Sequence, residues 1–260
     1  MMEGNLHITG VSLTFLLIII AIGISYYQKL GVEKDIGVSS VRTVIQLMIM
    51  GYVLEYILQI EHFLIVIIIL FCMILFGAYT SSKRSQQIEG AFFISFISIL
   101  LGVMISLGVV LIANKIALKA QYVIPISSMI ISTSMNANSL ALTRLRAEIQ
   151  ASKNQIEAAL CLGATTKQAS NNVIKNSIKA ALIPSIDRAK TVGIVTLPGS
   201  MTGMIFAGIS PLYAIKYQLL IECILIGAIA ISVFSSTLLS YRKFFTKDDS
   251  LKYETIIEQE

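Results

Sequence analysis

The sequence predicts an all-α membrane protein, a bundle of about seven transmembrane helices. Composition is the first reason: 55% of the 260 residues are hydrophobic and only 13% are charged, whereas a soluble chain carries about 25% charged residues. A soluble domain of this length could not bury so much apolar surface in one core. The length of the apolar runs is the second reason, because a helix needs about 20 mostly apolar residues to cross a bilayer.

Seven apolar runs have this length. Each must be a helix, because in lipid the backbone has to satisfy its own hydrogen bonds. The second and fifth runs are the most polar. The expected spans are residues 9–28, 41–60, 62–80, 91–113, 123–144, 191–214 and 217–240.

The distribution of basic residues predicts which connections lie on the cytoplasmic side of the membrane. Lys and Arg concentrate in alternate connections, and the most basic of these extends from Arg144 to Lys190 and includes Arg188. The positive-inside rule therefore predicts an outer N-terminus and a cytoplasmic C-terminus. The connection with Lys115 and Lys119 is the exception. The net charge of +5 is explained by this rule, so we expect no nucleic-acid partner.

The longest polar segment, about 146–188, is predicted to form a helical hairpin on the cytoplasmic face. Ile149 and Ile156 recur at helical spacing, and Gly163 has the freedom to close the first helix. Thr165 or Thr166 then caps a second helix, which we expect over about 167–181 with a stop at Pro184. From the residues alone, the hairpin is either an interfacial anchor or a docking element for a cytoplasmic partner.

Two motifs resemble known permeases. Glu157, Ala158, Ala159 and Gly163 have the spacing of the EAA-x-x-x-G loop of ABC transporter permeases, although Pro184 comes later than that pattern's proline. The stretch 191–212, with Leu197-Pro198-Gly199 at its centre, resembles the FetB/YbbM family of permeases. That resemblance covers most of the chain and extends to Asp187-Arg188, Met135-Asn136-Ala137, Leu142, Arg144 and Tyr217-Gln218.

The resemblance implies a function and partners. Bacterial members of this family are described as the membrane subunit of an ABC exporter for iron, and plant relatives are linked to aluminium tolerance and nucleotide-sugar transport. In such permeases the EAA loop is the coupling helix that docks on the ATP-binding subunit. The resemblance thus implies one permease domain over 1–260, multi-pass in the plasma membrane, that exports iron or another metal ion. It also implies a homodimer of permeases in the complex.

ATP hydrolysis is assigned to a separate subunit, because the chain has no GxxxxGK[ST] motif. We therefore expect no enzyme activity and no cofactor in this chain, with ATP bound by an ATP-binding-cassette partner. Two alternatives stay open. One is a permease for a nucleotide sugar or other small polar solute, and the other is a membrane structural or regulatory protein without transport.

A transport path is expected from polar, soft or helix-breaking residues inside the apolar runs. Intramembrane acids are costly and point to function, although either acid could be an interfacial anchor. Proline and glycine break span six, as transporters do at substrate sites. Hydroxyl and amide groups on span five also fit ordinary helix contacts, and methionine more often serves packing. The spacing defines no metal ligands. The path candidates are Glu55, Asn136, Asn138, Pro198, Gly199, Met201, Met204 and Glu222.

Overall fold

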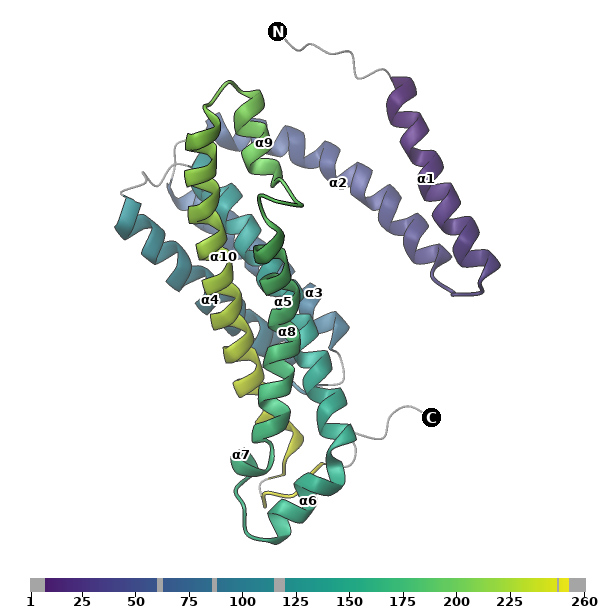
Figure 1. Cartoon of the computed structure of the whole chain (residues 1–260), viewed down its shortest axis with the longest axis vertical. Coiled ribbons are helices and arrows are strands. Elements are labelled where there is room, and N and C mark those ends of the chain that lie inside the picture. The colour runs from purple at the N-terminus through teal and green to yellow at the C-terminus, as the bar shows by residue number, and fades with distance from the viewer. Residues whose placement is uncertain (1–7, 60–62, 86–87, 115–119, 247, 253–260) are drawn as a thin grey trace. The chain divides into compact units, whose positions relative to one another are not determined.

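The computed structural model describes residues 8–59, 63–85, 88–114, 120–246 and 248–252. All regular elements in these ranges are helices (Figure 1). The chain forms two compact units, Met1–Glu61 and His62–Glu260. The helices are α1 (Ile8–Tyr27), α2 (Glu33–Gln59), α3 (Phe63–Arg84), α4 (Ala91–Asn114), α5 (Ala120–Ala151), α6 (Lys153–Cys161), α7 (Thr166–Ala169), α8 (Asn171–Thr191), α9 (Gly199–Phe206), α10 (Pro211–Ser240) and the 3-10 helix η1 (Tyr241–Phe244).

The first unit is a helical hairpin of α1 and α2. The connection turns through the left-handed backbone of Lys29 and Gly31. The hydroxyl of Ser25, near the end of α1, donates a 2.9 Å hydrogen bond to Glu33, at the start of α2. The side chains of α2 described here are mostly exposed within the chain, as expected for a helix whose surroundings are lipid or another protein.

The second unit is a bundle in which α10 packs against α4, α5 and α8, and α3 packs against α4 and α5. Its apolar core includes Ile99, Ile130 and Ala228, all fully buried. Helices α4 and α10 approach closely at Gly102, where an added Cβ would lie 3.0 Å from the carbonyl oxygen of Ala228. Glycine at helix contacts of this kind lets backbones pack closely in membranes.

Four helices in the described part are long and apolar enough to cross a membrane: Glu33–Glu55, Leu64–Arg84, Ala91–Ile112 and Pro211–Phe244. The segment Phe15–Tyr27 is a shorter apolar helix. The prediction of an all-helical membrane protein is therefore confirmed. The total of seven spans, their orientation and the single domain over 1–260 stay predictions.

The expected sixth span, 191–214, is not one helix. Helix α8 ends at Thr191 and α9 begins only at Gly199. Between them the carbonyl of Thr191 accepts three backbone N–H groups, from residues 194 to 196, in a tight turn. Pro198 has no N–H and disfavours helix at the residue before it. At about 12 Å, the eight residues of α9 are too short to cross the hydrocarbon core.

Helix α8 corrects a second expectation, because Pro184 does not end it. The second helix of the hairpin is divided into α7 and α8, and α8 continues through Pro184 to Thr191. One proline removes only one backbone donor from a helix of 21 residues. Arg188, expected in a cytoplasmic connection, is therefore a helical residue of α8.

Candidate functional site

The turn between α6 and α7 is a closed hairpin tip. Gly163 has a φ of +87°, and its N–H donates to the carbonyl of Leu160 at 2.9 Å. The N–H of Ala164 donates to the carbonyl of Ala159 at 3.0 Å. These two bonds form a Schellman motif, which satisfies carbonyls at the end of a helix. The prediction that Gly163 closes the first helix is confirmed.

Thr165 then starts the next helix with a capping box. Its hydroxyl accepts the backbone N–H of Gln168, whose side chain accepts the N–H of Thr165. Because both turn motifs involve neighbouring residues, the tip has a fixed geometry that needs no other part of the chain.

The two faces of α6 differ. Ile156 is 1% exposed and belongs to an apolar cluster with Leu145, Ile149 and Phe244. Ala158 is exposed, and Leu162, one turn later, is 89% exposed. One face of α6 is therefore anchored to the bundle, while the other presents an apolar patch at the tip.

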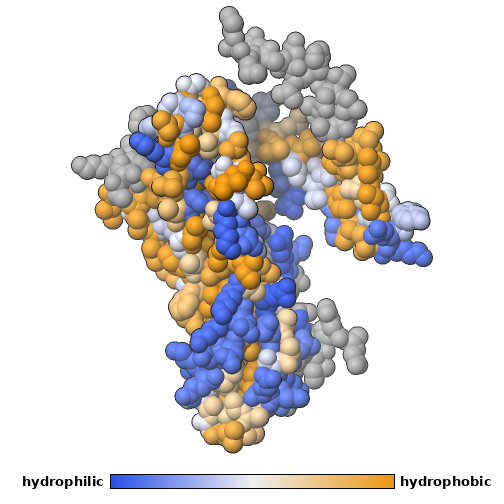
Figure 2. Space-filling view, in the orientation of Figure 1, coloured by the Kyte–Doolittle hydropathy of each residue, from blue (hydrophilic) through white to orange (hydrophobic). Residues whose placement is uncertain are grey.

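The anchor extends to the C-terminal segment. Phe245 pairs with Leu251 in an isolated bridge, and both side chains are buried in the same cluster as Ile156. Lys252 forms a 3.1 Å ion pair with Glu89. Figure 2 shows hydrophilic residues over the part of this unit that leads to α6 and α7, with a small apolar area at its very end. A hydrophilic surface is expected for a part outside the lipid.

A second region is a polar seam along one face of α10, defined by Gln218, Glu222, Ser232 and Ser236. Glu222 accepts a 3.0 Å hydrogen bond from the guanidinium of Arg188 on α8, and the two groups form an ion pair. Both lie beside or within the apolar segment Pro211–Phe244. Ionisable residues at such positions are expected to pair with each other.

The remaining seam contacts join α9 and α5 to α10. The Ser200 hydroxyl donates to the Gln218 side chain at 2.6 Å. Further along, the Asn138 side-chain oxygen accepts from Ser232 at 3.1 Å and from Ser236 at 3.2 Å. Asn138 is fully buried, so it fastens α5 to α10 rather than lining an open path in this conformation.

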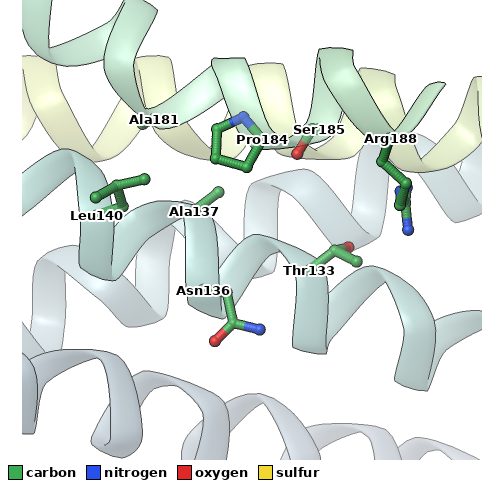
Figure 3. A pocket seen from close by; sticks show the side chains of 8 residues that line it. All are labelled: Thr133, Asn136, Ala137, Leu140, Ala181, Pro184, Ser185 and Arg188. Carbon is green, nitrogen blue, oxygen red and sulfur yellow. The ribbon is translucent and has the colours of Figure 1, made fainter. Parts of the chain in front are cut away.

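A hollow of about 230 Å³ lies between α5 and α8. Figure 3 shows Pro184 and Arg188 on α8, on the side that meets α5. The lining residues are Thr133, Asn136, Ala137, Leu140, Ala181, Pro184, Ser185 and Arg188.

The structure brings some of the predicted path residues together. Asn136 lies at the hollow, and Glu222 pairs with Arg188, which also lines it. Met201 and Met204 are partly buried on α9, next to the break that contains Pro198 and Gly199.

Glu55 is exposed and belongs to the first unit, whereas the other path candidates belong to the second. No group of three or more His, Cys, Asp or Glu side chains suited to a metal ion occurs among the described residues.

Sequence reasoning missed the roles of Arg188, Ser200 and Gln218. The spacing of Gln218, Glu222, Ser232 and Ser236 indicates the seam, because steps of four, ten and four residues keep polar groups near one helix face. Nothing local in the sequence indicates the partners across the bundle.

Comparison with known proteins gives related chains of similar length. The family model described as "Uncharacterised protein family (UPF0014)" matches residues 8–245. "Probable iron export permease protein FetB" of Escherichia coli (strain K12) is 41% identical over 96% of this chain and 97% of its own. "UPF0014 membrane protein YjkA" of Bacillus subtilis (strain 168) is 36% identical over 94% of this chain and 97% of its own. "Protein ALUMINUM SENSITIVE 3" of Arabidopsis thaliana is 34% identical over 88% of this chain and 84% of its own. No solved structure matches the chain.

Proposed function

Because this chain belongs to the UPF0014 family of membrane proteins, we propose that it is the membrane-spanning permease subunit of an ABC transporter that exports iron or another metal ion. One observation carries the proposal: the likeness to a probable iron export permease extends over 96% of the chain. The plasma membrane is the proposed location. The chain itself hydrolyses no ATP, which an ATP-binding-cassette subunit binds and cleaves, and two copies of the permease form the complex.

The hairpin tip is the proposed docking element. Its coupling residues are Glu157, Ala158, Ala159 and Gly163, and exposed Leu162 lies beside them. The apolar patch of Ala158 and Leu162 fits a groove on a protein partner, since the rest of this end is hydrophilic (Figure 2). Because a docked apolar side chain is removed from water, it contributes to affinity.

The hairpin connects directly to the helices around the hollow. Only Ser152 separates α5 from α6, and α8 follows α7 after Ser170. Movement of the tip by the partner is therefore transmitted to α5 and α8, which change the shape of the hollow between them. This is a two-state lever of the kind that coupling requires.

The proposed topology has seven crossings with the N-terminus outside and the C-terminus in the cytoplasm. The 32 residues of α5 are about 48 Å long, longer than the hydrocarbon core of about 30 Å. Helix α5 therefore extends past the membrane toward the hairpin. The sixth crossing is a broken one, made of the end of α8, the turn at 192–198, and α9. Non-helical backbone at membrane depth is tolerated where protein or a cavity surrounds it.

Docking is tested with the variant Leu162→Glu. The control is Asn176→Glu, which adds the same charge at an exposed position of α8. With the ATP-binding subunit co-expressed, we expect Leu162→Glu to lose co-purification and Asn176→Glu to keep it. Equal recovery of the partner with Leu162→Glu would contradict the docking role.

The cargo is tested by ATPase stimulation of the complex in liposomes. The proposal expects Fe(II) or Mn(II) supplied with a chelating anion to stimulate hydrolysis more than UDP-glucose does. A response to UDP-glucose alone would favour the nucleotide-sugar alternative, and no response to any metal would overturn metal export.

A further inference from the structure

The hollow between α5 and α8 is lined by apolar and polar residues in equal number. Among its lining residues, Arg188 is the one charged side chain, Asn136 contributes an amide, and Ser185 contributes a hydroxyl. No carboxylate is among these eight residues. The polar part of the wall therefore combines one cation with neutral groups that can donate hydrogen bonds, which suits a ligand with negative charge.

Glu222 leaves much of Arg188 available. The ion pair joins one guanidinium nitrogen, Nη2, to one carboxylate oxygen at 3.0 Å. A guanidinium has five N–H donors in a planar fork, so a single contact with Glu222 uses a small part of them. The Arg188 side chain is 38% exposed and that of Glu222 only 14%, so the exposed partner of the pair is the cation.

Such a wall discriminates between classes of cargo. Guanidinium forks match carboxylate and phosphate oxygens in geometry and charge. A bare divalent cation that enters the hollow meets the exposed, positive member of the Arg188–Glu222 pair first. The Glu222 carboxylate, which would attract such a cation, is paired with Arg188 and is not among the lining residues.

We propose that the α5–α8 hollow binds an oxyanion group, a carboxylate or phosphate, with Arg188 as its anchor and with Ser185 and Asn136 as further polar contacts. If the chain is the permease proposed above, its cargo enters this site as an anion. A metal would therefore travel in an anionic chelate rather than as a bare ion. This second statement rests on the proposed function, whereas the oxyanion site does not.

The site is tested on the full chain alone, without the ATP-binding subunit, in nanodiscs of neutral lipid. The probes are citrate and inorganic phosphate, followed by calorimetry. Loss of a charge-assisted hydrogen bond predicts that Arg188→Gln weakens binding by about 10- to 100-fold. Lys190→Gln is the control, since it removes a neighbouring cation that pairs with exposed Asp187, and we expect wild-type affinity.

Two further variants separate binding from stability. Arg188→Gln leaves the Glu222 carboxylate unpaired, which could itself destabilise the protein. The double variant Arg188→Gln/Glu222→Gln has no unpaired charge, and we expect that it also fails to bind citrate and phosphate. Glu222→Gln alone removes the competing carboxylate, and we expect tighter binding of citrate. If the ion pair were purely structural, both Arg188→Gln and Glu222→Gln would bind citrate more weakly.

The outcomes are distinct. Absence of citrate and phosphate binding in the wild type, or unchanged binding in the double variant, would overturn the site. Binding of Fe(II) alone that depends on Glu222 but not on Arg188 would also overturn it. In nanodiscs with phosphatidylglycerol, competition with citrate assigns the oxyanion to a lipid headgroup, and absence of competition assigns it to a soluble anion. Loss of partner docking in Leu162→Glu bears on the proposed function only.

Discussion

Gly163→Ala is the sharpest test of the hairpin tip. Gly163 has a φ of +87°, and the left-handed region costs a residue with a Cβ about 1–2 kcal/mol. A Cβ built at this position meets nothing within 4 Å. Backbone strain is therefore the whole expected effect, and no clash adds to it.

This strain has a measurable size. A free energy of about 1–2 kcal/mol corresponds to a factor of about 5–30 in an equilibrium constant. The two N–H groups that close the tip, at positions 163 and 164, donate to the carbonyls of Leu160 and Ala159. We expect their hydrogen exchange to accelerate by that factor in Gly163→Ala, while the amides of α10 keep their rates.

Hydrogen exchange with mass spectrometry or NMR in detergent micelles measures this change. Gly163→Asn is the matched control, because asparagine adopts the left-handed region more readily than alanine. Its acceleration should therefore be smaller. Unchanged protection in Gly163→Ala, or an equal effect of both variants, would refute the assignment of the tip to the left-handed backbone.

Two more predictions concern the bundle. Gly102→Ala places a Cβ 3.0 Å from the Ala228 carbonyl and should destabilise the protein by about 1–3 kcal/mol. Gly108→Ala, in the same helix, meets nothing within 4 Å and should stabilise the protein by up to about 1 kcal/mol. Melting points in one detergent compare the two variants, and equal values would contradict the close approach of α4 and α10. Asn138→Ala removes the acceptor of two serine hydroxyls and should lower the free energy of unfolding by about 0.6–2 kcal/mol. Asn136→Ala, at an exposed position, should leave the melting point unchanged. A larger drop in melting point for Asn136→Ala than for Asn138→Ala would count against the seam.

The candidate site could be predicted from the sequence only in part. Asn136 and Glu222 are candidates on sequence alone, because polar groups stand out in apolar runs. The contact of Glu222 with Arg188 cannot be predicted, because the neighbouring basic residues predict a cytoplasmic connection for Arg188. Asn138 is a candidate both for a transport path and for an ordinary helix contact, and its full burial between α5 and α10 favours the contact. Burial depends on which helix lies opposite, and spacing along one helix does not contain that information.

The amino-acid sequence alone is enough to predict the membrane class, the bounds of α1 and α4, and the hairpin tip. Apolar run length reflects bilayer thickness, and the turn at Gly163 and Thr165 is closed by bonds between residues at most five apart. Only the tertiary structure revealed the continuation of α8 through Pro184 and the pairing of Arg188 with Glu222. These two residues are 34 positions apart, so the packing of α8 against α10 places them together, and no local preference encodes their contact.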